Sequence, residues 1–183
     1  MSLIICPGIH EPNLTESFLA GLRSLPTNQK PENILIFPTQ DYPAYSSGDI
    51  LQFLRQNHSL SVPIAFISFS AGVVGAIAAA WGWQLLGGQI TAFIALDGWG
   101  VPLIGNFPIH RLSHDYFTHW SSALLGSGED SFYAAPSVEH LELWRQPQIV
   151  SGWWIHSLNG KTEQKTRITA AQFLTILLER YHS

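Results

Sequence analysis

The chain carries one serine whose neighbours suit it to nucleophilic chemistry. Ser70 lies in the run Ser68-Phe69-Ser70-Ala71-Gly72, between an apolar run and a stretch rich in alanine. This order predicts a strand that turns directly into a helix, and such a turn pushes a serine hydroxyl out above the sheet. The N–H of Ala71 would then lie at the helix N-terminus, where it can stabilise an oxyanion. A tight turn without a catalytic function is the alternative.

Alternating apolar runs and helical patterns supply the elements around this serine. Short apolar runs predict strands over residues 3–6, 33–37, 64–68, 90–96, 108–113 and 131–135. A capping box at Asn13 and Glu16 predicts the start of one helix, and Ser46 or Ser47 is expected to start a second. Two further helices are expected over residues 71–86 and 167–181. This alternation indicates an α/β fold, a three-layer sandwich with a mostly parallel sheet of about six strands, in a single domain over residues 1–183. Residues 143–164 predict only a tryptophan-rich loop.

Composition excludes several classes of protein. Hydrophobic residues make up 46% of the 183 residues and charged residues 12%, which excludes intrinsic disorder and a coiled coil. The net charge is −4 and no run of basic residues occurs, so a nucleic-acid partner is not expected. The one cysteine, Cys6, fits a reducing compartment and favours a cytoplasmic location.

One long uncharged stretch raises the question of a membrane span. Residues 56–96 lack Asp, Glu, Lys and Arg and are numerous enough to cross a bilayer. Pro63 and Gly87-Gly88 divide the stretch into strand, helix and strand, the pattern of a parallel sheet that is buried on both faces. The N-terminus lacks the basic and apolar regions of a signal peptide. We therefore expect no integral membrane segment.

The chain resembles the α/β-hydrolases, and in particular the small, capless, retinoblastoma-binding-protein-9-like serine hydrolases. The resemblance rests on the Ser68–Gly72 motif and on the loop Pro7-Gly8-Ile9-His10 after the first strand, and it covers about residues 2–145 and the last helix. Ser68 stands where that family usually has glycine. The resemblance implies a minimal α/β-hydrolase fold without a cofactor or metal, and a second oxyanion donor from the N–H of Ile9 or His10.

The resemblance also implies the order nucleophile, acid, histidine along the chain. A histidine is needed as general base because the serine hydroxyl is unreactive until a neighbour takes its proton. His140 follows the last predicted short strand by a few residues, where this fold places its base, and it is preferred among the eight histidines. His156 is one alternative, and His114 or His119 is another.

Two aspartates that follow predicted strands compete to orient that histidine. Asp115 follows the strand at 108–113 and matches the usual position of the family's acid, so it is preferred. Asp97 follows the strand at 90–96, where some lipases carry their acid, and is the alternative. The other carboxylate is expected to cap a loop or to act as a supporting hydrogen-bond partner.

A second constellation lies in the same segment. His110, His114, Asp115 and His119 fall within ten residues, and imidazole and carboxylate groups are good zinc ligands. Their spacing matches no metal-site pattern, so we expect no metal. One or two of these histidines are expected to flank the mouth of the site instead, with Arg111 paired to a carboxylate.

Three tryptophans are candidates for the substrate pocket. Trp99, Trp120 and Trp144 fall in segments expected at the carboxyl edge of the sheet, where open α/β folds bind ligands. Trp81 and Trp83 are expected in the core. Few residues separate the fourth and fifth predicted strands, so the chain has room for a minimal lid at most.

Together these features predict a serine hydrolase that cleaves a small or medium-sized carboxylic ester or thioester through an acyl-enzyme at Ser70. A non-catalytic module of the same fold, which binds an apolar ligand or a protein partner, is the alternative. The pair Trp153-Trp154 raises a third possibility, an enzyme that acts at a lipid surface. The oligomeric state stays open at this stage.

Overall fold

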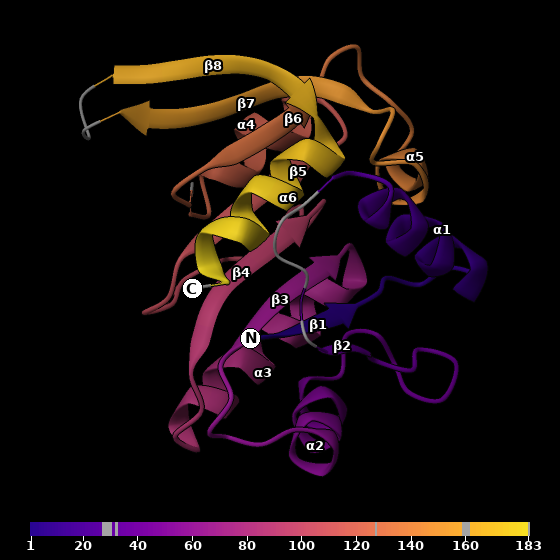
Figure 1. Cartoon of the computed structure of the whole chain (residues 1–183), viewed down its shortest axis with the longest axis vertical. Helices are drawn as coiled ribbons and strands as arrows, with labels where there is room; N and C mark the ends of the chain where they lie inside the picture. Colours follow the sequence, from indigo (N-terminus) through magenta and orange to yellow (C-terminus); the bar gives the residue numbers. More distant parts are fainter. Residues whose placement is uncertain (27–30, 32, 127, 159–161, 183) are drawn as a thin grey trace.

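A single eight-stranded sheet organises the chain, in the strand order β2-β1-β3-β4-β5-β6-β7-β8 (Figure 1). The computed structural model describes residues 1–26, 31, 33–126, 128–158 and 162–182. The strands are β1 (Ser2–Cys6), β2 (Asn33–Ile36), β3 (Ile64–Phe69), β4 (Ile90–Leu96), β5 (Ile109–Ser113), β6 (Ser131–Ala134), β7 (Ser151–Leu158) and β8 (Thr162–Thr169). Strands β1 to β6 pair in parallel, and β7 and β8 pair antiparallel. The expected α/β class with a mostly parallel sheet is confirmed, but the expected number of about six strands is too small.

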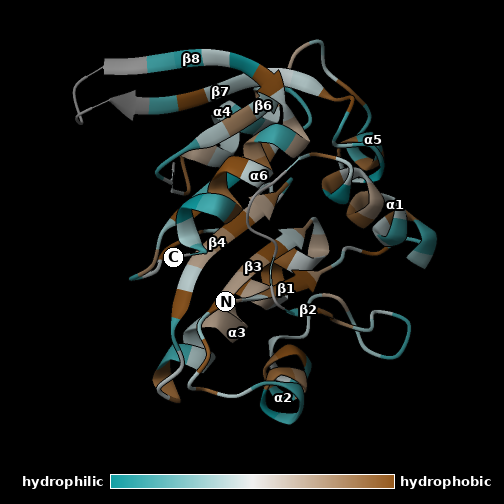
Figure 2. Ribbon diagram, viewed as in Figure 1, coloured by the Kyte–Doolittle hydropathy of each residue, from teal (hydrophilic) through white to brown (hydrophobic). Residues whose placement is uncertain are grey.

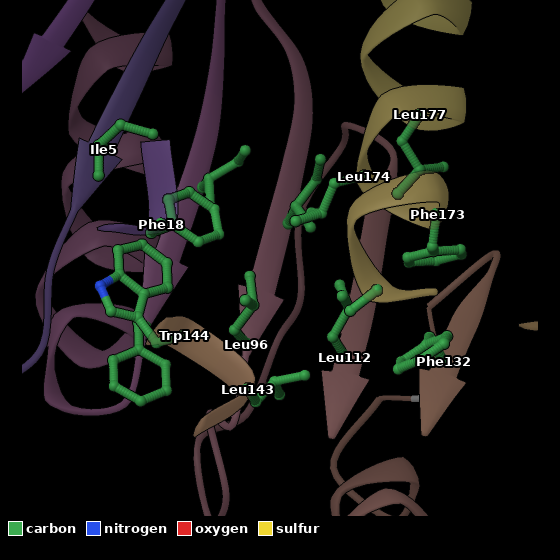
Figure 3. Close-up of a cluster of buried hydrophobic side chains, with 14 of the residues drawn as sticks. Ile5, Phe18, Leu96, Leu112, Phe132, Leu143, Trp144, Phe173, Leu174 and Leu177 are labelled. Atoms are coloured by element: carbon green, nitrogen blue, oxygen red, sulfur yellow. The ribbon is translucent and has the colours of Figure 1, made fainter. Parts of the chain in front are cut away.

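Helices cover both faces of this sheet because its central strands are apolar on both sides. The helices are α1 (Pro12–Arg23), α2 (Ser47–Asn57), α3 (Ala71–Leu85), α4 (Tyr116–Ala123), α5 (His140–Arg145) and α6 (Ala170–Tyr181). One buried cluster joins the sheet to α1, α5 and α6, and a second joins it to α2 and α3. Figure 3 shows the first cluster, in which Phe18 of α1, Trp144 of α5 and Leu174 of α6 meet strand residues such as Leu96.

The hairpin of β7 and β8 is the largest departure from the expected elements. Strand β7 and the first three residues of β8 lie in the region 143–164 that was expected to be a tryptophan-rich loop. The last three residues of β8, from Arg167 to Thr169, were expected to begin the last helix. Strand β8 reads Thr-Glu-Gln-Lys-Thr-Arg-Ile-Thr and lies at the edge of the sheet, where charged side chains are favoured. Figure 2 shows the contrast between the tan and brown central strands and β8, which is mostly pale to teal and brown only near its arrowhead. An edge strand of this composition gives no apolar run to detect.

Helix capping also differs from the expectation. Helix α1 begins with Pro12 at its first turn after Glu11, and no side-chain capping bond forms, so the predicted capping box at Asn13 is wrong. A capping box does occur at α6, where the Thr169 hydroxyl accepts from the Gln172 N–H and the Gln172 side chain accepts from the Thr169 N–H.

The uncharged stretch from 56 to 96 forms β3, α3 and β4, as the sequence indicated. Both strands of this stretch are almost wholly buried, which explains why they lack charged residues. Throughout the described ranges, every helix falls short of the length and apolarity needed to cross a bilayer.

A short irregular segment, residues 98–108, connects β4 to β5. The buried guanidinium of Arg111 lies beneath it and donates to three main-chain carbonyls, those of Val101, Leu125 and Gly126. Arg111 therefore bonds to main-chain oxygens here and not to the carboxylate expected from the sequence. These bonds hold the irregular segment against the end of α4, which satisfies carbonyls that no helix or strand would otherwise pair.

Candidate active site

Ser70 forms the junction between β3 and α3 in a strained backbone conformation. Its φ is 53° and its ψ is −122°, a region that non-glycine residues adopt only when their surroundings enforce it. Its own N–H donates to the Leu96 carbonyl at 2.9 Å, which ties the turn to the end of the neighbouring strand. The result is the sharp strand-to-helix turn that the Ser68–Gly72 pattern indicates.

The close approach of α3 to β1 explains the glycine in this motif. A Cβ at Gly72 would lie 2.4 Å from the carbonyl oxygens of both Cys6 and Pro7. No side chain fits there without moving the main chain. At the other small position, Ser68 is fully buried, and within the described part of the chain its Oγ has no hydrogen-bond partner. Serine therefore fits sterically where glycine is usual, at the expense of a buried unpaired hydroxyl.

The loop after β1 lies directly against Ser70. A Cβ at Gly8 would lie 3.0 Å from the Ser70 Cβ, so the next main-chain N–H groups, of Ile9 and His10, belong to the same neighbourhood. Burial lowers the pKa of His10, with the hydrogen bond to the Glu11 carbonyl acting in the opposite direction. Because α3 begins at Ala71, the N–H of Ala71 is one of the donors that the helix itself leaves unpaired.

Asp97 occupies the corresponding position at the end of β4. Phe69 and Leu96 are paired in the sheet, so Ser70 and Asp97 follow neighbouring parallel strands at the same level. Within the described ranges these two are the non-glycine residues with positive φ, since Asp97 has φ 50°. Two adjacent strand ends thus carry strained backbone at one edge of the sheet, where open α/β folds place their ligands.

His140, at the start of α5, contacts Asp97. Its Nδ1 lies 2.8 Å from Asp97 Oδ2, and its ring stacks on Phe69 with centroids 4.7 Å apart. With Nδ1 donating to a carboxylate, the Nε2 of a neutral ring is left as the acceptor, which is the form a general base requires. The contact with Phe69 fixes the ring beside the residue that precedes Ser70.

A second histidine shares the same carboxylate. His114 Nδ1 lies 3.0 Å from Asp97 Oδ2, and the His114 main-chain N–H donates to Oδ1 at 2.9 Å. Burial alone would raise the pKa of Asp97, but the hydrogen bonds from His114 and His140 outweigh it and lower the pKa below its ordinary value. The bond to Asp97 in turn raises the pKa of His114, against the effect of burial. Asp97 is therefore a buried, ionised carboxylate held on both oxygens.

The contact expected between Asp115 and His140 is wrong, and Asp97 makes that contact instead. Asp115 is the N-cap of α4, and its Oδ1 accepts from the Thr118 N–H at 2.7 Å. The physical reason is the early start of α4 at Tyr116, which commits the Asp115 carboxylate to the helix end. Asp115 thus has the capping role that was expected for whichever aspartate does not orient the histidine.

Ser70, Asp97, His114 and His140 line one cleft of about 330 Å³, together with Ala71, Val74, Trp99, Val101 and Thr118. Within the described residues, no hydrogen bond directly joins Ser70 Oγ to His140. Catalytic hydrogen bonds are often long before substrate binds, so a shared cleft is the relevant relationship. Comparison of the sequence with models of known protein families and with curated proteins finds no match.

Of the three tryptophans predicted to line the pocket, only Trp99 does so. Trp144 is fully buried and stacks on Phe18 with ring centroids 3.8 Å apart, so it belongs to the core (Figure 3). Trp120 lines a separate hollow beside α4 and β6. The expectation for Trp81 and Trp83 is half right, because Trp83 is buried whereas Trp81 is 47% exposed.

The remaining histidines are dispersed. His110 is buried on the α6 side of β5, where Nε2 lies 2.9 Å from the Tyr181 hydroxyl, and burial lowers its pKa to about 4. His156 stacks on Trp154 in the β7–β8 hairpin. His114 Nε2 lies 3.9 Å from Asp115 Oδ2, but His110 lies on the α6 side of β5 and His119 lines the hollow beside β6, so these four residues do not form one site. A different set does converge, because donor atoms of Asp97, His114 and His140 lie within 4.8 Å of one another. The position of His114 at the end of β5, one strand beyond Asp97, is the signal that could have paired them.

Proposed function

We propose that the protein is a serine hydrolase that cleaves a small or medium-sized carboxylic ester or thioester. The observation that carries the proposal is the convergence of the strained Ser70 turn and the Asp97–His140 pair on one cleft. Positive φ at a serine costs about 1–3 kcal/mol, and a fold retains such strain chiefly where function requires it. A strained serine beside an imidazole that a buried carboxylate orients is suited to acyl transfer.

In this proposal Ser70 Oγ attacks the substrate carbonyl while His140 Nε2 accepts the hydroxyl proton. Asp97 holds the His140 Nδ1–H and stabilises the imidazolium that forms. The N–H of Ala71 and that of Ile9 or His10 would donate to the oxyanion. His140 then returns the proton to the departing alcohol or thiol. Water attacks the acyl-enzyme in the second half, with the same histidine as base, and releases the acid and free Ser70.

His114 acts in this proposal as a positioning residue. Its ring and its main-chain N–H engage one oxygen each of Asp97, so the carboxylate is fixed in the plane that faces His140. This arrangement limits rotation of the carboxylate, and orientation of that kind preserves the productive tautomer of the base. The effect reaches the substrate only through Asp97 and His140.

The walls of the cleft set the substrate class. Val74, Trp99 and Val101 give it an apolar side, and a volume of about 330 Å³ accommodates a short or medium acyl chain. No Lys or Arg side chain lines the cleft among the described residues, so a phosphorylated substrate would find no strong cationic partner beyond the histidines.

A metal-dependent hydrolase is the second candidate, because the donor atoms of Asp97, His114 and His140 are close enough to share one cation. The two candidates differ in their response to chelation. A serine mechanism predicts that the rate of ester hydrolysis is unchanged after treatment with EDTA. A metal-dependent mechanism predicts that activity is lost and that addition of Zn²⁺ restores it.

Hydrolysis of p-nitrophenyl acetate, butyrate and octanoate tests the proposal. We expect Ser70→Ala to lose nearly all activity, and Ser68→Ala, the same chemical change two residues away, to retain it. Equal rates for the two variants would remove Ser70 from the mechanism. An inactive but folded wild type would favour the non-catalytic alternative, a module that binds an apolar ligand or a protein partner.

A further inference from the structure

Helix α3 presents an apolar stripe to solvent. Val74, Ala78, Trp81 and Leu85 recur at helical spacing on its exposed side, and Leu85 is 89% exposed. An exposed side of a helix is normally polar, so an apolar one indicates a surface that meets another apolar phase.

The stripe belongs to a larger surface that continues through residues 98–108 to α4. Trp81 Nε1 donates to the Ile104 carbonyl at 2.7 Å, and Trp99 Nε1 donates to Ser121 Oγ at 3.1 Å. These bonds place the three segments side by side. The α3–α4 apolar surface comprises the exposed large hydrophobic residues Val74, Trp81, Leu85, Leu86, Trp99, Ile104, Phe117, Leu124 and Leu125. Tyr116 and Trp120 are excluded because they line the separate hollow beside β6, together with Lys165.

The segments that form this surface carry almost no charge. From residue 56 to residue 128 the sequence contains only Asp97, Arg111 and Asp115 among its Asp, Glu, Lys and Arg residues. Asp97 and Arg111 are buried, and Asp115 caps α4. Apolar segments with exposed tryptophan and so few charges match the composition of segments that lie at the interface between lipid and water.

We propose that the α3–α4 apolar surface docks the protein on an uncharged lipid surface, which makes the substrate of the cleft a lipid-soluble ester. A lipid layer as the occupant rests on the proposed hydrolase function. Val74 and Trp99 belong both to the surface and to the wall of the cleft. A protein partner on the surface would also cover that wall and obstruct access, whereas a lipid layer covers the same residues and supplies the ester.

The Trp153-Trp154 pair, which suggested a lipid surface at the sequence level, does not contribute. The indole of Trp154 donates to Asp130 Oδ1, and the guanidinium of Arg167 lies over the Trp153 ring. Both rings are half-buried and engaged with charged groups, so a lipid-facing role falls to a different part of the chain.

Co-sedimentation with phosphatidylcholine vesicles tests this proposal. Ser70→Ala is used as the background, so that binding is measured without turnover. Leu85→Ser combined with Ile104→Ser removes two exposed side chains of the surface. Leu60→Ser combined with Ile149→Ser is the matched control, since these residues are also exposed but come from other loops. We expect the first pair to need about tenfold more lipid for half-maximal binding, and the control to bind like the background protein.

A background protein that stays in the supernatant, or surface variants that bind equally well, would overturn the proposal. A dimer that the Leu85 and Ile104 changes dissociate, seen by light scattering without vesicle binding, would also overturn it and make a second copy the occupant. Active-site labelling of the wild type is scored separately. Vesicle binding without active-site labelling would support the docking surface and refute the proposed hydrolase function.

Discussion

The carboxylate of Asp97 lies 2.8 Å from the His140 ring, across the ends of two strands that are not neighbours in the sheet. Strand β5 lies between β4 and β6, and His114 at its end contacts the same oxygen. The ends of β4 and β5 and the first residue of α5, the helix that follows β6, therefore contribute to one cluster. Parallel strands bring their carboxyl ends to one edge, which is why residues far apart in the chain meet here.

The choice between the two aspartates gives the first prediction. Asp97→Asn should lower kcat/KM for p-nitrophenyl butyrate by about 10⁴-fold, because the amide no longer orients and stabilises the His140 imidazolium. Asp115→Asn should remain within a few-fold of wild type. Asparagine caps a helix as well as aspartate, so α4 should be kept. Loss of activity in Asp115→Asn with retention in Asp97→Asn would reverse the assignment.

The raised pKa of His114 predicts a pH-dependent contribution to stability. A cationic His114 beside Asp97 is stabilising, and this contribution is complete below the ordinary pKa of 6.5 and disappears as pH rises through the higher folded-state pKa. Urea unfolding should therefore show a larger deficit for His114→Gln at pH 6 than at pH 9. His156→Gln controls for the loss of an imidazole that does not contact Asp97. A deficit that grows as pH rises would contradict the sign.

The backbone strain at Ser70 predicts an unusual order of stability. Glycine adopts positive φ without penalty, so Ser70→Gly should be more stable than Ser70→Ala by about 1 kcal/mol. The matched control is Ser17 in α1, where Ser17→Gly should be less stable than Ser17→Ala by about the same amount. Thermal unfolding of the four variants gives both comparisons. If the glycine variant were less stable than the alanine variant at both positions, the turn at Ser70 would be unstrained.

The tight contact at Gly72 predicts that the turn tolerates no Cβ. Gly72→Ala should lower the free energy of unfolding by about 3 kcal/mol or more, because the two main-chain oxygens it meets cannot move independently. Gly48 at the start of α2 is the control, since a Cβ there meets nothing within 4 Å and Gly48→Ala should be neutral or stabilising. Denaturant titration of both variants measures these changes in the free energy of unfolding. A Gly72→Ala variant as stable as Gly48→Ala would contradict the prediction and show that β1 can move away from α3.

Local patterns in the sequence were sufficient for the central strands and for the turn at Ser70. The apolar runs of β1, β3 and β4 are buried on both faces, so their composition alone predicts these strands. Strand β8 gives no such signal, because an edge strand can consist of polar residues and take its partner from β7. The outer part of the sheet depends on long-range pairing that no local pattern records.

The site was predictable in its residue types and only partly in its pairing. Ser70, His140 and both aspartates were candidates, but the choice between Asp97 and Asp115 depended on where α4 begins, because a helix that starts at Tyr116 takes Asp115 as its N-cap. Local sequence patterns do not fix a helix boundary to within one or two residues. Burial of Trp144 could not be read locally either. Its ring lies between α1 and β3, where Phe18 and Phe69 contact it, and those contacts come from distant parts of the chain.

Covalent labelling with a fluorophosphonate probe tests the central claim most directly. The probe should react with wild type and with Ser68→Ala to give one adduct, and peptide mapping by mass spectrometry should place it on Ser70. Ser70→Ala should give no adduct, and His140→Gln should react far more slowly because the hydroxyl keeps its proton. Adducts of equal yield in wild type and Ser70→Ala, or none in a folded wild type, would contradict the claim that Ser70 is an activated nucleophile.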